Sequence, residues 1–385
     1  MAKYKLNDIA PIQQGDVPKA DEYWLLNLDM VESNTGKVID YVYCDESAIG
    51  NSTVRFDTRN VLYSKLRPYL NKVVIPKKAG YATSEMLPLR PNPEIVTREY
   101  LTYYLRSPSF VSYINEKTSG AKMPRADSSD LKEYLIDCPD ISVQERITAQ
   151  FDKLVSIIYE RKTELEKLDE LIKARFVEMF GDLADPACKW EKCKLVDACV
   201  NSDDIKCGPF GTQLGKDEYT EEGVAVWEIP QINSEFRTLP THFVTEKKAE
   251  ELDAYSIIPG DIAMSRKGNV GRCAVFPSSF ENGIIHSDVL RIRLNEMKAL
   301  PEFMMRQLHY SGDIQHQIEL VSSGAIMAGI NVTKLKQILI YLPPMNLQSE
   351  FVEFVAQVDK SKVAVQKSLD ETQLLFNSLM QKYFG

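Results

Sequence analysis

The sequence predicts an α+β protein in which two globular domains alternate with two long helices, packed as an antiparallel coiled coil in a pseudo-two-fold internal repeat. Three observations predict this fold. The chain resembles itself at an offset of 204 residues, each copy ends in a heptad-patterned segment, and the part before that segment contains short β-rich runs broken by Pro and Gly. With 385 residues and 44% apolar content, the chain can bury two cores.

The repeat is clearest at the end of each copy. Residues 119–181 align with 323–385 without a gap, and about fourteen of the 63 positions are identical, including SGAKM against SGAIM at the start. Further upstream the offset drifts from 204 to 203, 201 and 189. A variable module therefore precedes a segment of fixed length, twice.

The fixed segments predict long helices. No Pro or Gly lies between Ile141 and Phe180, so one helix of about 40 residues, roughly 60 Å, is expected there. Gly181 and Gly385 stand where a helix-ending glycine belongs. The expected seam residues are Ile147, Phe151, Leu154, Ile158, Leu165, Leu168, Ile172 and Met179, and in the second copy Phe351, Val355, Val358, Val365, Leu369, Phe376, Leu379 and Tyr383. The alternative is a coiled coil between two chains, which would make a homodimer.

The variable modules predict α+β domains. Expected strands at 71–75, 224–227 and 289–293 are rich in β-branched residues, and one shorter helix is expected after the strands of each module, at 100–113 and 302–318. The predicted boundaries are a first domain at 1–140, a central helix at 141–181, a second domain at 182–344 and a C-terminal helix at 345–385.

Basic residues are clustered in both modules although the net charge is −9. Eight basic residues stand against two acidic ones from Arg55 to Arg90, and five against two from Met264 to Arg293. Loop-like stretches in these regions combine the side chains that suit phosphate contact and base readout. The candidate DNA-contacting residues are Ser64, Lys65, Arg67, Tyr69, Asn71, Lys72 and Arg90 in the first copy, and Ser265, Arg266, Lys267, Asn269, Arg272 and Arg293 in the second. The alternative is that these are ordinary exposed loops.

No catalytic or metal-binding constellation is found. The four cysteines between 188 and 207 lack the paired spacing of a zinc site, and the Gly-rich stretch at 207–217 lacks the first Gly and the final Ser/Thr of a phosphate loop. We therefore expect no catalytic residue, metal or cofactor in this chain. The polar N-terminus and the lack of a long apolar run predict a cytoplasmic protein without signal peptide or membrane span.

Several motifs carry a family resemblance. Ser-Gly occurs at 119–120 and 323–324, Pro-x-x-x-x-Gln at 139–144 and 343–348, and Phe-Gly at the end of each long helix. With these motifs, the whole chain resembles the specificity subunit of type I restriction-modification systems. Pro-Phe-Gly at 209–211 and Pro-Gly-Asp-Ile at 259–262 fit the same pattern, whereas the first copy departs from it with Arg-Asn-Val-Leu at 59–62.

The resemblance implies a division of labour. The chain would be a non-catalytic DNA-binding subunit whose two domains, as target-recognition domains, each read one half of a bipartite, non-palindromic site. The helices would set the spacing and hold two methyltransferase subunits, which carry S-adenosylmethionine. A restriction subunit using ATP and Mg²⁺ is an optional further partner. The alternative is a coiled-coil scaffold whose α+β modules bind proteins; it would show no sequence-dependent, salt-sensitive DNA binding.

Overall fold

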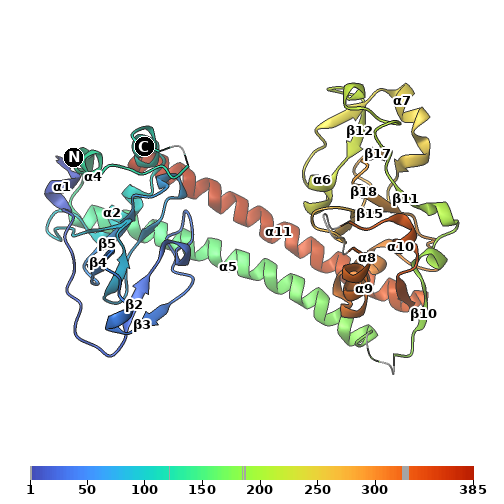
Figure 1. Cartoon of the computed structure of the whole chain (residues 1–385), viewed down its shortest axis with the longest axis horizontal. Helices are drawn as coiled ribbons and strands as arrows, with labels where there is room; N and C mark the ends of the chain where they lie inside the picture. The colour runs from blue at the N-terminus through green and yellow to red at the C-terminus, as the bar shows by residue number, and fades with distance from the viewer. Residues whose placement is uncertain (1, 121, 184, 186–187, 323–328) are drawn as a thin grey trace. The chain divides into compact units, whose positions relative to one another are not determined.

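The computed structural model describes residues 2–120, 122–183, 185, 188–322 and 329–385 (Figure 1). The chain forms two compact units, Met1–Glu164 with Val365–Gly385, and Leu165–Ala364. Both predicted long helices are present, and each contributes one part to each unit. They are α5 (Ile141–Phe180) and α11 (Met345–Phe384).

The first unit holds a domain of two small sheets. The four-stranded sheet has the order β3-β2-β7-β4, the three-stranded sheet the order β6-β5-β8, and β1 pairs with β9. Only β2 and β7 run parallel among these pairs. The strands are β1 (Ala2–Lys5), β2 (Tyr23–Leu26), β3 (Val42–Cys44), β4 (Thr53–Phe56), β5 (Val61–Ser64), β6 (Val73–Val74), β7 (Gly80–Thr83), β8 (Met86–Leu89) and β9 (Leu135–Cys138). The short helices are α1 (Leu6–Ile9), α2 (Arg98–Leu105), α3 (Pro108–Glu116) and α4 (Ser128–Glu133).

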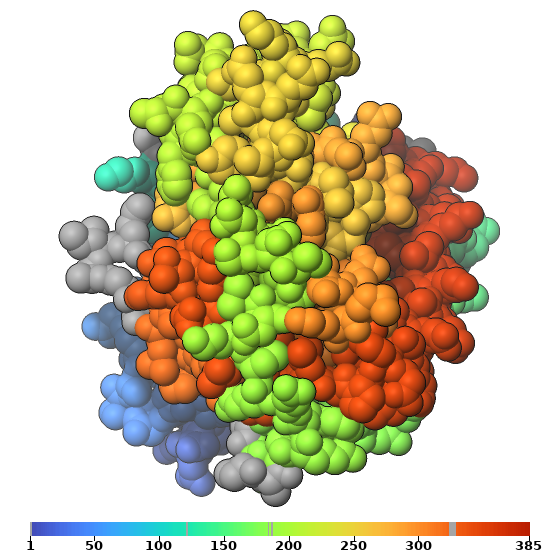
Figure 2. Space-filling view, turned by 90° about the vertical axis from the view of Figure 1, so that its right-hand side faces the viewer, coloured from blue at the N-terminus to red at the C-terminus, as the bar shows by residue number. Residues whose placement is uncertain are grey.

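The second unit repeats this topology with one additional strand, β11, which pairs with β18. Its sheets have the orders β13-β12-β17-β14 and β11-β18-β15-β16, β10 pairs with β19, and the parallel pair is β12 with β17. The strands are β10 (Glu191–Lys194), β11 (Ile205–Cys207), β12 (Val224–Trp227), β13 (His242–Val244), β14 (Ser256–Ile257), β15 (Ile262–Ser265), β16 (Cys273–Val275), β17 (Gly283–Ile285), β18 (Val289–Ile292) and β19 (Leu339–Leu342). The short helices are α6 (Ile229–Asn233), α7 (Glu246–Glu251), α8 (Pro301–Tyr310), α9 (Gly312–Ser322) and α10 (Val332–Lys336). The internal repeat is confirmed, and Figure 2 shows this unit with the α7 region uppermost.

The expectation of one shorter helix after the strands of each module was wrong. The first module has α2 and α3, because Ser107 caps α3 with its side chain and Pro108 occupies the first turn, where a missing N–H costs nothing. The second has α8 and α9, which are separated at Ser311. The strand expected at 71–75 is only Val73–Val74, because Asn71 adopts a left-handed conformation with φ 52°.

The two long helices pack against each other with opposite directions. In the second unit, Lys362 Nζ lies 2.6 Å from Asp169 Oδ1, and the ring of Phe176 packs on Phe351 with centroids 5.5 Å apart. As the residue number rises along α5, the partner's number on α11 falls. The antiparallel pairing predicted from the heptads is therefore confirmed within a single unit.

The Phe-Gly motif anchors the end of each helix in aromatic cores. In the first unit, the ring of Phe384 packs against Tyr100 and Phe151 at centroid distances of 5.3 and 5.6 Å. In the second, Phe180 packs against Phe303 and Phe351 at 4.9 and 5.6 Å. Each terminal Phe thus fixes a helix end to the short helix that follows the sheets.

The Pro-x-x-x-x-Gln motif joins each long helix to its domain. The buried amide of Gln144 accepts the N–H of Thr97 at 2.9 Å and donates to the carbonyl groups of Ile95 and Pro139, both at 2.8 Å. The buried Gln348 makes the equivalent bonds, to Leu300 N–H at 2.9 Å and to the carbonyl groups of residues 298 and 343 at 3.0 and 2.8 Å. A buried amide with donor and acceptor both satisfied explains why Gln occupies this position.

No helix among the described residues combines the length and apolar character needed to cross a membrane.

Candidate nucleic-acid interface

The two candidate loops, residues 64–72 and 265–272, follow the equivalent strands β5 and β15 and share one backbone path. The N–H of Ser64 donates to the carbonyl of Lys72 at 3.1 Å, and the N–H of Ser265 donates to that of Arg272 at 2.7 Å. Each loop contains two residues with positive φ. The first of them, Arg67 or Gly268, lies three residues after the serine. The second, Asn71 or Gly271, directly precedes the residue whose carbonyl accepts the serine N–H.

Further backbone bonds hold both loops in place. The residue after each serine, Lys65 or Arg266, donates its N–H to the carbonyl of Glu85 or Asp288, at 3.0 and 2.9 Å. Its own carbonyl accepts the N–H of residue 126 or 330. These segments follow the Ser-Gly motifs, of which the second, at 323–327, lies outside the described residues. The loops are therefore two copies of one rigid scaffold.

The candidate residues of the first loop fall into two groups, according to whether their side chains face inward or outward. Ser64, Asn71 and Lys72 face inward: the hydroxyl of Ser64 donates to Leu66, the Asn71 amide to Arg106, and Lys72 Nζ to the Leu28 carbonyl at 2.6 Å. Burial lowers the pKa of Lys72. The outward-facing residues are Arg67, Tyr69 and the half-buried Lys65.

The second loop exposes Lys267 and Asn269. Arg266 is half-buried and fixed, since its Nε donates to the Ile330 carbonyl at 3.2 Å and its Nη1 to that of Ser287 at 3.3 Å. Ser265 is fully buried. Arg272 pairs with Glu235 at 2.9 Å.

An ion pair lies next to each loop, and its cationic residue comes from a different segment in the two copies. Glu85 pairs with Arg125 at 3.0 Å in the first unit, and Asp288 with Lys267 at 2.7 Å in the second. Arg125 lies opposite Leu66 in a β-bridge, and Lys267 lies opposite Gly329 in the equivalent bridge. The cation therefore belongs to the loop itself in the second copy, and to the segment opposite the loop in the first copy. The pair therefore supports the scaffold.

Arg90 and Arg293 occupy equivalent positions and are engaged within the protein. Arg293 binds Asp261, which is 2% exposed, and Arg90 donates to Asp57 at 3.0 Å. Burial alone would raise the pKa of Asp57, but hydrogen bonds from Arg59, from the Asp16 N–H and from Arg90 outweigh it and hold that pKa well below its ordinary value.

The first copy's departure from the Gly-Asp-Ile pattern leaves the turn unchanged. Asn60 Oδ1 accepts the N–H of Asp57 at 3.0 Å, as Asp261 Oδ2 accepts the N–H of Ile258 at 2.9 Å. Both turns also contain the reverse backbone bond, at 3.1 and 3.0 Å. In the first copy, the amide oxygen of Asn60 takes the place of the carboxylate oxygen of Asp261. The carboxylate that binds the arginine belongs to Asp57, three residues before Asn60.

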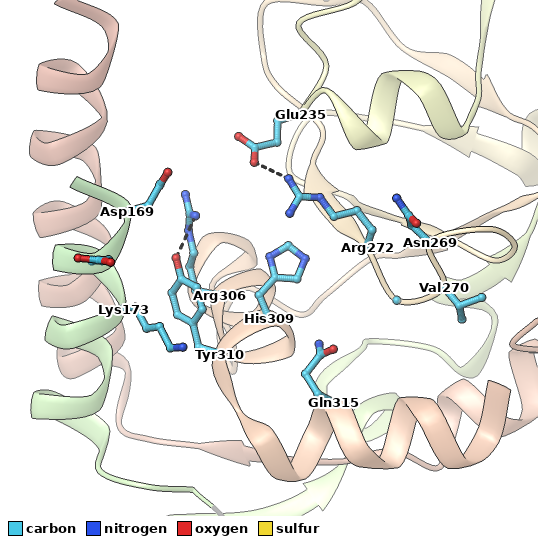
Figure 3. Close-up of a pocket in the computed structure, with 12 residues that line it drawn as sticks. Asp169, Lys173, Glu235, Asn269, Val270, Arg272, Arg306, His309, Tyr310 and Gln315 are labelled. Atoms are coloured by element: carbon cyan, nitrogen blue, oxygen red, sulfur yellow. Dashed lines mark hydrogen bonds and ion pairs between the residues drawn. The ribbon is translucent and has the colours of Figure 1, made fainter. Parts of the chain in front are cut away.

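A cleft of about 740 Å³ lies beside the second loop (Figure 3). The ring of His309 points into it between Arg272 and Arg306, and Asp169 and Lys173 of α5 line its opposite side. His309 Nε2 accepts the N–H of a residue of β16, Cys273, at 3.2 Å. Burial, and then the neighbouring arginines, lower the pKa of His309 to about 4. The ring is therefore neutral at pH 7.

One exposed aromatic residue beside the second loop, Phe210, was not among the candidates predicted from the sequence. Its ring lies under the guanidinium of Arg266, whose Cζ is 5.2 Å from the ring centroid. The only available signal was its position in a Pro-Phe-Gly loop. Among the described residues, no group of three or more His, Cys, Asp or Glu side chains is placed to hold a metal ion.

The fold and these paired loops define a protein with two copies of one α+β domain, each joined to a long helix. A family model for the type I restriction modification DNA specificity domain matches residues 1–169 and 189–372. The chain therefore belongs to this family.

Curated relatives carry the corresponding names. The EcoDI specificity subunit of Escherichia coli is 29% identical over 124 residues, covering 32% of this chain and 27% of that protein. The StySPI specificity subunit of Salmonella potsdam is 21% identical over 312 residues, covering 76% and 65%. The chain thus spans less than two thirds of the length of each.

Two solved structures share the fold over almost their whole length. A chain from a study of complex assembly and conformational transition in the type I R-M system superposes with a TM-score of 0.61 at 19% identity, covering 100% of this chain and 97% of that one. The type I restriction-modification S subunit from M. genitalium gives 0.58 at 16% identity, covering 100% and 96%.

Proposed function

We propose that this chain is the DNA-recognition subunit of a type I restriction-modification complex and catalyses no reaction itself. One observation carries the proposal: the two domains present the same loop scaffold with different exposed side chains. The first loop offers Arg67 and Tyr69, where the second offers Lys267 and Asn269. A constant backbone with variable side chains is what a protein needs to read two different sequences.

On this proposal each domain reads one half of a bipartite site. Because the exposed side chains differ between the copies, the half-sites differ and the site is not a palindrome. The outward-facing candidates contact DNA; they are Lys65, Arg67, Tyr69, Asn269 and also Lys267, whose exposed side chain pairs with Asp288 in the structure. The remaining candidates, which are buried or half-buried and bonded within the protein, act through the scaffold and position these groups; they are Ser64, Asn71, Lys72, Arg90, Ser265, Arg266, Arg272 and Arg293.

The long helices would set the distance between the half-sites and hold the partner subunits. Each has 40 residues, or about 60 Å at 1.5 Å per residue. Two methyltransferase subunits carrying S-adenosylmethionine would bind them, and a restriction subunit using ATP and Mg²⁺ would be a further partner. Basic residues of those subunits would supply part of the phosphate contact that a chain of net charge −9 lacks.

Binding of the complex with its methyltransferase partner to DNA tests the proposal. The cognate duplex should be bound more tightly than a scrambled duplex of equal length, with an affinity that falls steeply with salt concentration. A coiled-coil scaffold with protein-binding modules would show neither sequence preference nor a steep salt slope. Methyl transfer by this chain without partners would contradict its non-catalytic role.

A further inference from the structure

Two of the four histidines share one carboxylate in the second domain. His242 Nδ1 lies 2.8 Å from Oε2 of Glu228, and His286 Nε2 lies 3.9 Å from Oε1 of the same side chain. Glu228 follows β12, His286 follows β17, and His242 begins β13. Because β12 and β17 are parallel and β13 is antiparallel to β12, these three residues meet at the same end of the sheet.

This group of side chains is connected to the second candidate loop. His286 Nδ1 accepts the N–H of Asp288 at 3.2 Å, and Asp288 Oδ1 lies 2.7 Å from Nζ of Lys267. Lys267 is an outward-facing residue of the loop to which the proposed function assigns DNA contact. A duplex that contacts this loop therefore lies beside the histidines at the end of the sheet.

The ring of His242 is exposed and yet held in one orientation. Its side chain is 47% exposed. The ring of Tyr219 packs against it, with the centroids 4.8 Å apart and the planes tilted by 32°. A carboxylate only accepts hydrogen bonds, so Nδ1 donates to Glu228, and Nε2 of the neutral imidazole is an acceptor. Among the residues that the structure describes, Nε2 has no hydrogen-bond partner.

The first copy shows that the fold does not require these side chains. The strand registers align the two sheets residue by residue. The first copy has no titratable residue at the equivalent positions: Val42 stands for His242, Asn27 for Glu228 and Thr83 for His286. None of these positions belongs to the motifs that carry the family resemblance. Side chains that differ between two copies of one scaffold can make the copies read different sequences.

The chemistry of Nε2 selects a base rather than the DNA backbone. Phosphate oxygens only accept hydrogen bonds, so an imidazole nitrogen that also accepts cannot bond to them. The donors on the base edges in the major groove are exocyclic amino groups, N4 of cytosine and N6 of adenine.

We propose that Nε2 of His242 accepts a hydrogen bond from the exocyclic amino group of a cytosine or an adenine in the half-site read by the second domain. Glu228 and Tyr219 are the positioning residues that fix its ring. The inference rests on the proposed function. His242 is then a specificity-determining residue that the first domain replaces with Val42.

Base analogues that lack only the amino group test this contact. The methylated motif of cells that contain the chain supplies the cognate duplex. Each adenine is replaced in turn by purine and each cytosine by pyrimidin-2-one, with the methylated base left unchanged. The complex with its methyltransferase partner is titrated with each duplex at about pH 8, which favours neutral imidazole.

The wild-type complex is compared with the His242→Val complex, which carries the residue of the first copy. His242→Val should bind the unmodified duplex about 2- to 13-fold more weakly, the value of one hydrogen bond. At one position of one half-site, removal of the amino group should weaken the wild-type complex by a similar factor more than it weakens His242→Val. The analogue that produces this difference distinguishes adenine from cytosine. Effects on the duplex itself cancel, because both complexes meet the same DNA.

Three further variants make the result specific. His242→Gln keeps an acceptor and should retain part of the amino-group effect. Glu228→Asn carries the residue of the first copy and should reduce the amino-group effect at the same base, whereas a merely structural role would leave that effect unchanged. His316→Gln, at an exposed histidine of the same unit, should bind as the wild type does.

The outcomes separate the inference from the function. Equal affinity of the wild-type and His242→Val complexes for the cognate duplex, or equal amino-group losses in both at every position, would overturn the inference and leave the proposed function standing. If the wild-type complex does not prefer the cognate duplex to a scrambled one, the proposed function fails and the inference fails with it.

Discussion

Arg293 donates two hydrogen bonds to Asp261, from Nε to Oδ1 and from Nη2 to Oδ2, both at 2.8 Å. The carboxylate also accepts the N–H of Ile258, so one nearly buried side chain holds both the turn and the arginine. In the first unit the two tasks are divided: Asn60 holds the turn and Asp57 binds Arg90.

This division predicts a rescue by a second substitution. Asp261→Asn should keep the turn but remove the charged partner of Arg293, costing roughly 2–4 kcal/mol of unfolding free energy. Adding Ile258→Asp recreates the arrangement of the first unit, and Ile258 is only half-buried. The double variant should recover most of the loss in urea denaturation. A double variant that is less stable than Asp261→Asn would show that the two turns are not equivalent.

Arg67 adopts a left-handed conformation, with φ 49°, at the position where the second loop has Gly268, with φ 68°. A non-glycine residue in this conformation costs about 1–2 kcal/mol. Arg67→Gly should therefore leave the protein equally or more stable in thermal unfolding, while weakening cognate DNA binding by roughly 1–3 kcal/mol if Arg67 reads a base. Unchanged DNA affinity would remove Arg67 from the interface. The matched control Gly268→Ala should be destabilised.

His309 makes the stability of the second unit depend on pH. Its pKa is about 4 in the folded chain against 6.5 ordinarily, so the unfolded state binds more protons between these values. The stabilisation is fully present above pH 6.5 and is lost as the pH falls towards 4, by at most roughly 3 kcal/mol.

Substitution of His309 isolates this contribution. His309→Gln cannot titrate but keeps an acceptor for the Cys273 N–H, so the decline in unfolding free energy between pH 6.5 and 4 should be shallower than in the wild type. His316→Gln is the control, because His316 is exposed. Parallel pH curves for wild type and His309→Gln would argue against a buried neutral imidazole.

Lengthening both long helices should increase the distance between the two half-sites of the DNA. A seven-residue insertion in both helices, near residues 165 and 364, preserves the heptad register and adds about 10 Å to each helix. The spacer between half-sites should then grow by about three base pairs, at 3.4 Å each. Sequencing of methylated DNA measures the spacer. An unchanged spacer in an active complex would contradict the role of the helices.

The architecture could be predicted from the sequence because its signals are periodic. Heptad spacing and the absence of Pro and Gly predicted two long helices, and the constant offset predicted the repeat. The sequence-based prediction placed one short helix after the strands of each module, whereas the structure has two. The start of the second helix in the first module could have been found, because Ser107-Pro108 is a typical helix start.

The individual contacts could not be predicted, because they depend on tertiary geometry. Arg67 is an unusual residue for a left-handed position, and only its equivalence to Gly268 in space explains it. The replacement of Asp261 by Asn60 looked like a departure from the family pattern until the hydrogen bonds showed the same turn. The exposure of Phe210 likewise depends on a loop whose neighbours come from distant parts of the chain, such as His286 and Val289 against Gly208.

Sequencing of methylated DNA from cells with and without the gene for this chain tests the central claim most directly. Cells that contain the chain and its methyltransferase should methylate one bipartite, non-palindromic motif with a fixed spacer, and substitutions in the second loop should alter only one half of it. Methylation that persists without the chain, or a second-loop substitution that alters both halves, would contradict the account.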